Sequence, residues 1–206
     1  MNSYPVTALK YGLYQYGPKF FQGAKPDLVV TGPNLGSNIG LLNLFSGTSG
    51  AATYAVTNAS IPAISFSGGD ITKNAWNHST QSSSIYGELG TKLTNKLISA
   101  GKPYLPNNTF LNVNFPPLNN ATCPTADSFS FILTRINAPV PSTPPDIEIC
   151  DASRRLPNEF DVVLKGTIGC FVSVSVGYAD TKMDATINEQ TQVYQKLDGL
   201  LTCPTF

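Results

Sequence analysis

The segment Asp27-Leu-Val-Val-Thr-Gly-Pro-Asn-Leu-Gly-Ser-Asn-Ile-Gly40 joins an apolar, β-branched run to a glycine-rich loop. Residues 27–31 predict a buried strand. The alanine-rich segment 48–59 predicts a helix, and residues 61–67 predict a second strand, whose proline stands near the start, where a strand tolerates it. A strand, a helix and a strand in succession form a βαβ unit, which implies a parallel sheet.

The remaining segments extend this α/β pattern in both directions. Leucine and isoleucine recur at helical spacing over 85–97 and predict an amphipathic helix. Further helices are expected at 5–16 and 184–201, strands at 110–115 and 129–135, a proline-rich excursion at 137–158, and a hairpin made of 160–164 and 170–176. We therefore expect one α/β domain over residues 1–206, with a core at about 1–135 and an extension with the C-terminal helix at about 136–206.

The composition excludes several classes of protein. The 206 residues carry 13 basic and 13 acidic side chains, so no basic surface is available for a nucleic-acid polymer. No uninterrupted apolar stretch reaches about 18 residues, which argues against a membrane-spanning helix. Aromatic residues make up 10% of the chain, and together with the β-branched runs they argue against disorder.

The cysteines and the Asn-x-Ser/Thr triplets favour a secreted or extracytoplasmic protein. Two disulfides with three possible pairings suit the four cysteines, which are Cys123, Cys150, Cys170 and Cys203, although four reduced, buried thiols are the alternative. Four triplets permit glycosylation without showing it, and they begin at Asn58, Asn77, Asn107 and Asn120. The first residues lack the pattern of a signal peptide, and we interpret the N-terminus as incomplete.

The residues that suit chemistry are concentrated in the glycine-rich loop and in the helix start that follows it. Glycines let successive backbone N–H groups face an anion. Asn34 and Asn38 offer amide oxygens to a hard cation and amide N–H groups to a phosphate. Ser46-Gly47-Thr48 opens a helix, whose free N–H groups and positive dipole end form a second anion site. This combination suits hydrolysis of a phosphate ester, although an ordinary turn followed by a helix N-cap fits the same residues.

Residues 27–40, together with Phe45-Ser-Gly-Thr48, resemble the signature of the SurE family of 5′/3′-nucleotidases and acid phosphatases. The resemblance continues through Ile61-Pro-Ala-Ile64, Leu111-Asn-Val-Asn-Phe-Pro116 and Phe171-Val-Ser-Val174, and it covers essentially the whole chain. With its cysteines and triplets, the chain is most similar to the secreted fungal branch. The resemblance implies a Rossmann-like α/β fold with a β-hairpin extension, and dimers that exchange a C-terminal helix.

The resemblance also implies roles for individual residues. Asn34 matches an asparagine that ligates a divalent metal, usually Mn²⁺ or Mg²⁺, and Asn38, Ser46, Gly47 and Thr48 match positions that contact phosphate. The family's other metal ligands include two adjacent aspartates after its first strand, and no Asp-Asp pair occurs in this chain. We therefore interpret the first-strand region as missing, the set of metal ligands as incomplete and the catalytic residues as unidentified.

Polar residues outside this segment have simpler explanations. His78, the only histidine, suits a surface loop. Asp70 suits a turn, with a supporting role beside the site as the alternative. Asp180 and Asp184 are interpreted as acids in the first turn of the last helix. The arginine pair that ends at Arg155 is interpreted as solvated charge, with a reach toward phosphate as the alternative.

Two hypotheses of different classes follow. The first is a SurE-like phosphoric monoester hydrolase, a nucleotidase or acid phosphatase that uses a divalent metal and acts on nucleoside monophosphates or other small phosphate esters. The second is a non-catalytic relative or fragment that binds phosphate or another protein, because one neutral asparagine cannot hold Mn²⁺ or Mg²⁺ tightly in water. A lipase or esterase is a third reading, weakened because no Gly-x-Ser-x-Gly motif occurs. We expect a homodimer or higher homo-oligomer, because a sheet without one of its strands exposes an apolar edge.

Overall fold

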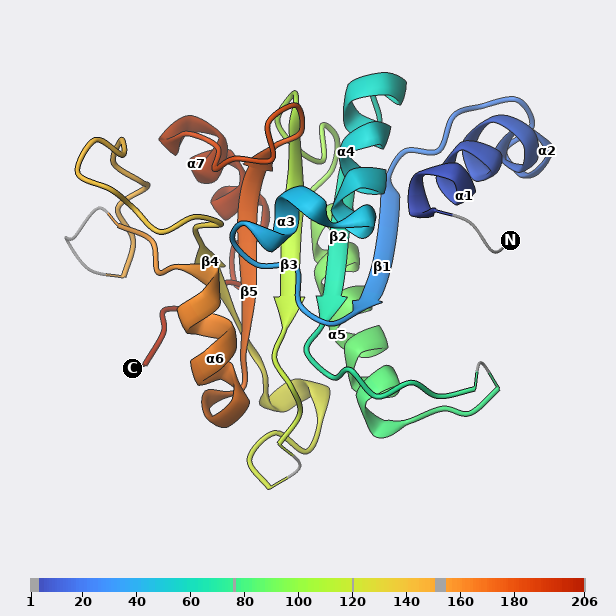
Figure 1. The fold of residues 1–206 in the computed structure, drawn as a ribbon. Coiled ribbons are helices and arrows are strands. Elements are labelled where there is room, and N and C mark those ends of the chain that lie inside the picture. The colour runs from blue at the N-terminus through green and yellow to red at the C-terminus, as the bar shows by residue number, and fades with distance from the viewer. Residues whose placement is uncertain (1–3, 76, 120, 151–154, 206) are drawn as a thin grey trace.

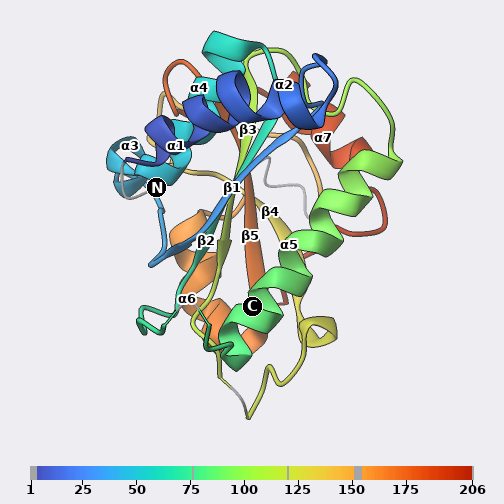
Figure 2. The same cartoon turned by 90° about the vertical axis from the view of Figure 1, so that its right-hand side faces the viewer.

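The computed structural model describes residues 4–75, 77–119, 121–150 and 155–205. A five-stranded sheet forms the centre of the molecule, and helices cover both of its faces (Figures 1 and 2). The strand order is β1-β2-β3-β5-β4. The strands are β1 (Val29–Leu35), β2 (Ala63–Gly68), β3 (Thr109–Phe115), β4 (Ser130–Thr134) and β5 (Phe171–Tyr178). The helices are α1 (Pro5–Tyr11), α2 (Gly17–Phe20), α3 (Leu42–Phe45), α4 (Gly47–Ala59), α5 (Gln81–Ser99), α6 (Glu159–Gly169) and α7 (Ile187–Lys196).

The first three strands confirm the predicted parallel βαβ arrangement. β1 pairs with β2 and β2 with β3, both in parallel, and α4 and α5 lie in the two connections. Both helices begin at a side-chain cap that the sequence supplies. The hydroxyl oxygen of Ser46 accepts the N–H of Ser49, and that of Thr80 accepts the N–H of Ser83.

The terminal helices differ from their predicted lengths. The helix expected at 5–16 is present as α1 and a π-helical turn, Gly12–Tyr16, and helical structure continues through α2. The last helix runs over 187–196, which is shorter than the predicted 184–201. No helix in the described part of the chain combines the length and the apolar character needed to cross a bilayer.

The predicted hairpin of 160–164 and 170–176 is wrong. Residues 160–164 belong to α6, which begins where the Asn158 side chain accepts the N–H of Phe160 at 3.0 Å. Val162, Val163 and Gly166 are buried at helical spacing, so the β-branched pair serves a helix face. β5 lies between β3, to which it is antiparallel, and β4, to which it is parallel. The sheet is therefore mixed, and after β5 the chain turns back to form an isolated antiparallel bridge between Gly177 and Asp184.

Alternate residues of the strands face opposite layers of helices. Ala63 packs with Ala52 and Ala55 of α4, whereas its neighbour Ile64 packs in the cluster that holds Leu89 of α5. Figure 2 shows the sheet nearly edge-on, with α3 and α6 on one side and α5 and α7 on the other. The larger core cluster lies on the α5 side, and small alanines let α4 approach the opposite face closely.

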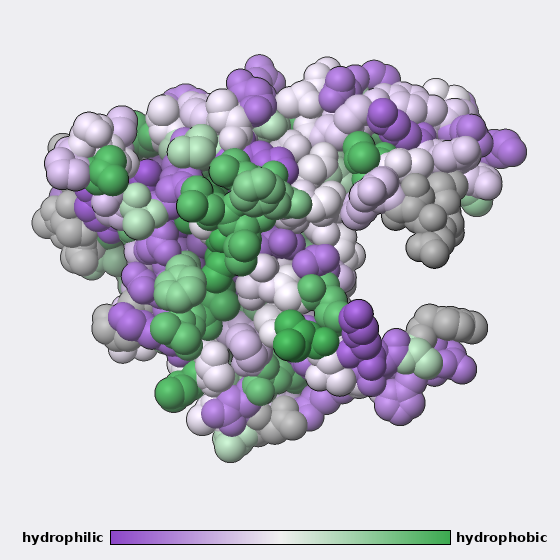
Figure 3. Space-filling model, in the orientation of Figure 1, coloured by the Kyte–Doolittle hydropathy of each residue, from purple (hydrophilic) through white to green (hydrophobic). Residues whose placement is uncertain are grey.

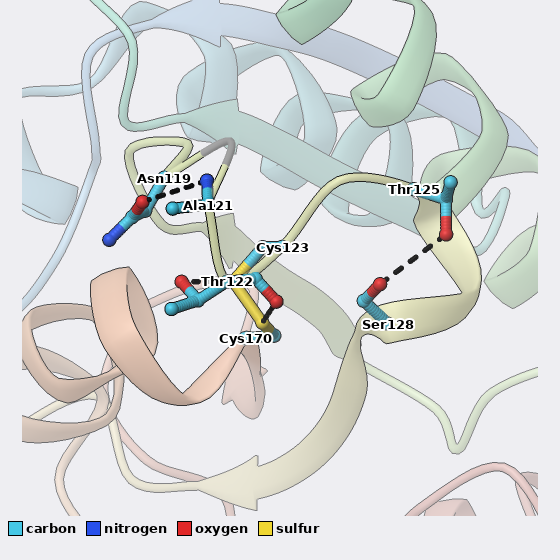
Figure 4. The surroundings of a disulfide bond; sticks show 7 residues. All are labelled: Asn119, Ala121, Thr122, Cys123, Thr125, Ser128 and Cys170. Carbon is cyan, nitrogen blue, oxygen red and sulfur yellow. Dashed lines mark hydrogen bonds between the residues drawn. A yellow bond between two sulfur atoms is a disulfide. The ribbon is translucent and has the colours of Figure 1, made fainter.

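Both predicted disulfides are present, and the structure selects one of the three pairings. Cys123 bonds to Cys170, and Cys150 bonds to Cys203. The first bond joins the loop after β3 to the residue that precedes β5 (Figure 4). The second ties the proline-rich segment to the C-terminal end of the chain. All four thiols are thereby removed as possible metal ligands.

β1 forms an open edge of the sheet. Among the described residues no strand pairs with its outer side, and Val30 and Leu35 are 48% and 46% exposed. An open strand of this kind presents unpaired backbone groups to solvent. The apolar edge expected from the sequence is therefore present.

Gly32 is required by the geometry of β1. The pairing of β1 with β2 shifts its register between Thr31 and Asn34, and Gly32 lies in this bulge with a φ of +93°. A Cβ at this position would lie 2.1 Å from the carbonyl oxygen of Phe66. Only glycine avoids both the contact and the strained backbone conformation.

We expect Gly32→Ala to lower the free energy of unfolding by about 3 kcal/mol or more, because strain and a backbone clash act together. Urea denaturation followed by circular dichroism measures the change. Gly87→Ala is the matched control, because Gly87 is exposed in α5 with no atom near its Cβ position. That variant should gain up to about 1 kcal/mol, and equal stability of the two variants would contradict the argument.

Candidate functional site

The glycine-rich loop runs from the end of β1 through α3 to the N-terminus of α4 (Figure 1). The side chain of Ser46 accepts the N–H of Ser49 at 3.1 Å. The N–H groups of Gly47 and Thr48 stand in the first turn, where a helix offers them no carbonyl partner of its own. The predicted anion site at Ser46-Gly47-Thr48 therefore coincides with a true helix start.

Hydrogen bonds to the sheet hold the first turn of α4. The hydroxyl of Thr31 on β1 donates to the carbonyl oxygen of Thr48 at 3.0 Å. The hydroxyls of Ser49 and Ser65 lie 3.2 Å apart, with Ser65 on β2. The Ser49–Ser65 contact is buried and the Thr31–Thr48 contact is partly buried, so two contacts with the sheet fix the direction of the helix start.

Asn34 lies near the C-terminal end of β1, and its side-chain oxygen, Oδ1, is available to a ligand. Its Nδ2 donates to the carbonyl oxygens of Leu35 and Gly36, at 3.1 and 2.9 Å. Oδ1 is the remaining polar atom of the side chain. Asn34 borders a cavity of about 540 Å³ on the Asp70 side and another of about 420 Å³ along the outer edge of β1.

The structure brings part of the predicted site together. Asn34 and Thr48 border the same cavity of about 420 Å³. Gly47 borders an adjacent cavity of about 370 Å³, and the ring of Pro5 covers it so closely that a Cβ there would meet Pro5 at 3.1 Å. Ser46 and Asn38 border neither of these two cavities.

Asn38 fastens the loop to the sheet. Its backbone N–H donates to Oδ1 of Asn114 at 2.8 Å, and its carbonyl oxygen accepts from Nδ2 of Asn112 at 2.9 Å. Its own Nδ2 donates to the hydroxyl of Ser67 at 2.7 Å. The side chain is 8% exposed, so its donors serve the fold, and the phosphate contact implied by the resemblance stays a prediction.

Glu159 is a residue that the sequence reasoning missed. Its carboxylate is completely buried and accepts the N–H of Gly40 at 2.7 Å, Nδ2 of Asn112 at 3.0 Å and the hydroxyl of Ser175 at 3.0 Å. Burial raises the pKa of Glu159 to about 8, against the lowering effect of these three donors. An acid at the start of α6 thus holds the middle of the glycine-rich loop, and no local pattern in the sequence marks it.

Lys182 is a second missed residue. Its ammonium donates to the carbonyl oxygens of Asn43, Leu44 and Ser46, at 3.2, 3.1 and 3.4 Å. Burial lowers the pKa of this ammonium below its usual value. The side chain closes the turn between α3 and α4 and places a positive charge beside the helix start that the sequence predicts to bind an anion.

The interpretation of Asp180 and Asp184 as acids in the first turn of the last helix is wrong. Both precede the start of α7 at Ile187, and Asp180 lies in an exposed turn. The side chain of Asp184 is 9% exposed, accepts the N–H of Ile136 at 2.6 Å and pairs with Arg135 at 3.3 Å. The guanidinium of Arg135 also pairs with Asp146, so a buried ionic cluster joins β4, the arm and the segment before α7.

Three other sequence interpretations have clear outcomes. Asp70 forms a turn by accepting the N–H of Thr72 at 2.9 Å, and it also accepts the hydroxyl of Ser82 at 2.6 Å. These two donors lower the pKa of Asp70, and the Ser82 hydroxyl has the larger effect.

His78 lies in an exposed loop that borders the larger cavity, as predicted. Arg155 is exposed, as predicted for a solvated charge, and its guanidinium donates to the carbonyl oxygens of Thr143 and Pro144.

The residues present do not complete a divalent-metal site. Asn34 supplies one neutral oxygen, and Mn²⁺ or Mg²⁺ requires several oxygen ligands, usually with a carboxylate among them. Asp70, the acid nearest in the larger cavity, already accepts two hydrogen bonds. In the described part of the chain no three acidic, histidine or cysteine side chains gather in a metal-binding group.

Glu159 should make the stability of the fold depend on pH. A carboxyl whose pKa rises on folding binds more protons in the folded state, so stability falls as pH rises from about 4.5 to about 8. The slope for one group is at most about 1.4 kcal/mol per pH unit. Denaturation at several pH values in this range should show a flatter dependence for Glu159→Gln than for the wild type.

Asp161→Asn is the control for this measurement, because Asp161 is exposed on the same helix. It should keep the wild-type dependence on pH. Identical slopes for Glu159→Gln and the wild type would show that Glu159 does not change its protonation between the folded and unfolded states.

Comparison with known proteins gives consistent results for sequence and fold. Residues 1–140 match the family model described as Survival protein SurE. An acid phosphatase from Yarrowia lipolytica is 38% identical over 119 residues, which cover 54% of this chain and 33% of the relative. A 5′-nucleotidase SurE from Aliarcobacter butzleri is 37% identical over 113 residues, which cover 52% of this chain and 40% of the relative.

The fold is similar to that of the SurE protein from Aquifex aeolicus. The TM-score is 0.58 at 21% sequence identity, and the match covers 96% of this chain and 74% of that chain. The Rossmann-like α/β fold expected from the sequence is therefore confirmed. The matched segment nevertheless spans less than half the length of each of the two curated relatives.

Proposed function

The chain belongs to the SurE family, and on that basis we propose that it carries the phosphate-binding part of a phosphoric monoester hydrolase, a nucleotidase or acid phosphatase. The substrate class is a nucleoside monophosphate or another small phosphate ester. One observation carries the proposal: the N-terminus of α4 opens at Ser46-Gly47-Thr48, where the sequence motif predicts phosphate contacts.

The chemistry of this helix start suits a phosphate group. The N–H groups of Gly47 and Thr48 and the positive end of the helix dipole favour an anion. The oxygen of Ser46 already accepts an N–H, which leaves its own proton free to donate to a phosphate oxygen. Donors held in place by the sheet can stabilise charge that develops on phosphate oxygens during hydrolysis without first reorganising.

A requirement for Mn²⁺ or Mg²⁺ is part of the proposal and rests on the family resemblance. Asn34 would contribute its Oδ1, which the hydrogen bonds of Nδ2 leave available. The described residues supply no complete set of ligands for such an ion.

We further propose a secreted or extracytoplasmic location. Both cysteine pairs are disulfide-bonded in the structure, and such bonds persist in oxidising compartments. Asn58, Asn77 and Asn107, which begin three of the four triplets, are exposed and therefore accessible to glycosylation. The fourth, at Asn120, lies outside the described residues.

Phosphate binding can be tested by titrating the isotope-labelled chain with inorganic phosphate and following backbone amides by NMR. We expect the amides of Gly47 and Thr48 to shift, with a dissociation constant of about 1 mM, typical of a weak contact. The start of α5 is the internal control, because Thr80 caps it in the same way. Equal shifts at both helix starts, or none at α4, would contradict the proposal.

Hydrolysis is tested by measuring phosphate release from nucleoside monophosphates and p-nitrophenyl phosphate with Mn²⁺ or Mg²⁺. If the chain hydrolyses these esters with a metal ion, release should fall at least about tenfold in Asn34→Ala, because Oδ1 of Asn34 is the one site ligand that the family motif assigns in this chain. Asn74→Ala is the control, because Asn74 borders the larger cavity and donates only to a backbone carbonyl. Phosphate binding without metal-dependent release would instead support the second candidate, a non-catalytic phosphate-binding protein.

A further inference from the structure

The candidate site has no charged side chain of its own. Between Asp27 and Asp70 the chain contains no acidic residue, no basic residue and no histidine, and this stretch holds β1, the glycine-rich loop, α3, α4 and β2. Leu42, Leu44 and Phe45 of α3 are 40–87% exposed, and Figure 3 shows a hydrophobic area on the face where α3 lies. A cationic side chain that helps to hold a phosphate must therefore come from another part of the chain.

Lys182 brings a positive charge to the turn between α3 and α4. Its ammonium donates to the carbonyl oxygens of Asn43, Leu44 and Ser46, at 3.2, 3.1 and 3.4 Å. An ammonium has three protons to donate, so three acceptors match its donors. A Cβ on Gly50, in the first turn of α4, would lie 3.8 Å from Nζ. The charge therefore stands beside the first turn of α4.

The turn after β5 holds Lys182 in this position. The N–H of Lys182 donates to the carbonyl oxygen of Tyr178, and the N–H of Tyr178 donates to that of Met183, both at 2.8 Å. Asp184 fixes the next part of the segment by accepting the N–H of Ile136 at 2.6 Å. Because the backbone is held on both sides of Lys182, less conformational entropy is lost when its ammonium binds the carbonyl groups.

The contact with Ser46 reaches the amide that is expected to bind phosphate. The carbonyl group of Ser46 and the N–H of Gly47 belong to the same peptide unit. A donor on the carbonyl oxygen polarises this unit and makes its N–H a stronger donor, by about 10–30% for each hydrogen bond. The carbonyl oxygen of Ser46 already accepts the N–H of Gly50 at 2.9 Å within α4, and Lys182 adds a second donor that is charged.

The charge of Lys182 is unfavourable for packing alone. Burial lowers the pKa of its ammonium, which means that the fold disfavours the charged form at this position. A methionine side chain would fill similar space without this cost. A charge held against a desolvation cost and beside a cavity is more typical of a functional site than of ordinary packing.

We propose that Lys182 is a positioning residue of the phosphate site, which strengthens the Gly47 amide as a donor and adds its charge to the positive end of α4. The inference rests on the proposed phosphate binding at Ser46-Gly47-Thr48. Lys182 acts through the peptide unit of Ser46 and Gly47 and through the electrostatic field at the helix start, and it does not itself contact the ligand.

NMR of the 206-residue chain tests the proposal with Lys182→Met, which keeps most of the side chain and removes the charge. Without phosphate, we expect the amide signal of Gly47 to move upfield, because its peptide unit loses a hydrogen bond at the carbonyl oxygen. With inorganic phosphate, the dissociation constant should rise about tenfold. Lys182→Arg, which keeps the charge and its donors, should recover most of the affinity.

Salt separates an effect of charge from a merely structural one. The difference in phosphate affinity between the wild type and Lys182→Met should shrink at about 1 M salt, where the screening length is about 3 Å. A structural effect would leave the difference unchanged. Circular dichroism checks the fold, and Lys182→Gln, which is neutral and keeps one donor group, gives the same comparison if Lys182→Met does not fold.

Lys196→Met is the matched control. Lys196 also donates to a backbone carbonyl oxygen, that of Gly101 at 2.9 Å, but it lies on α7, on the opposite side of the sheet from α3 (Figure 2). This variant should keep the wild-type signal of Gly47 and the wild-type affinity for phosphate.

The possible failures of the two proposals are distinguishable. If phosphate shifts the amides of Gly47 and Thr48 equally well in the wild type and in Lys182→Met, the role of Lys182 is refuted while the proposed phosphate binding stands. An equal loss of affinity in Lys196→Met, or a difference that salt does not change, would also overturn the role of Lys182. A wild type that binds no phosphate would overturn both proposals.

Discussion

The shape of the glycine-rich loop depends on buried polar groups that come from distant parts of the chain. Asn112 and Asn114 of β3 bind the carbonyl oxygen and the N–H of Asn38, and Glu159 of α6 binds the N–H of Gly40. Each partner lies 74 to 119 residues along the chain from the loop residue that it binds. Each partner side chain is fully buried, so the loss of one would leave a polar group unsatisfied where water cannot replace it.

The N-terminal and C-terminal parts of the chain contribute different groups to the candidate site. The N-terminal βαβ unit supplies the groups suited to a ligand, namely Oδ1 of Asn34 and the first turn of α4. The C-terminal part supplies groups that hold those elements in place, namely Glu159 and Lys182. Rigid placement matters because donors that are already oriented need not move when charge develops on a bound group. The extension is therefore part of the site's support, even though it contributes no group that the motif assigns to phosphate.

The support from the C-terminal part extends to the turn that precedes α4. α3 is a four-residue helix between the loop and α4, and Lys182 donates to the carbonyl oxygens of Asn43 and Leu44 at its end. The same ammonium donates to the carbonyl oxygen of Ser46, the cap of α4. A side chain outside the predicted site can in this way restrain the residues inside it.

The sequence by itself determined the parallel βαβ unit, the family and the position of the helix start at Ser46-Gly47-Thr48, where anion binding is proposed. These features depend on periodicity, turn residues and caps within a few positions of one another, so they are visible without contacts. Only the tertiary structure decided the disulfide pairing, the antiparallel placement of β5 against β3, and the roles of Asp184, Glu159 and Lys182. It also assigned residues 160–164 to a helix, because a short β-branched run fits a strand or a buried helix face until its neighbours are known. Long-range pairing carries no local signature, and burial, which changes the chemistry of Glu159, is a property of the fold alone.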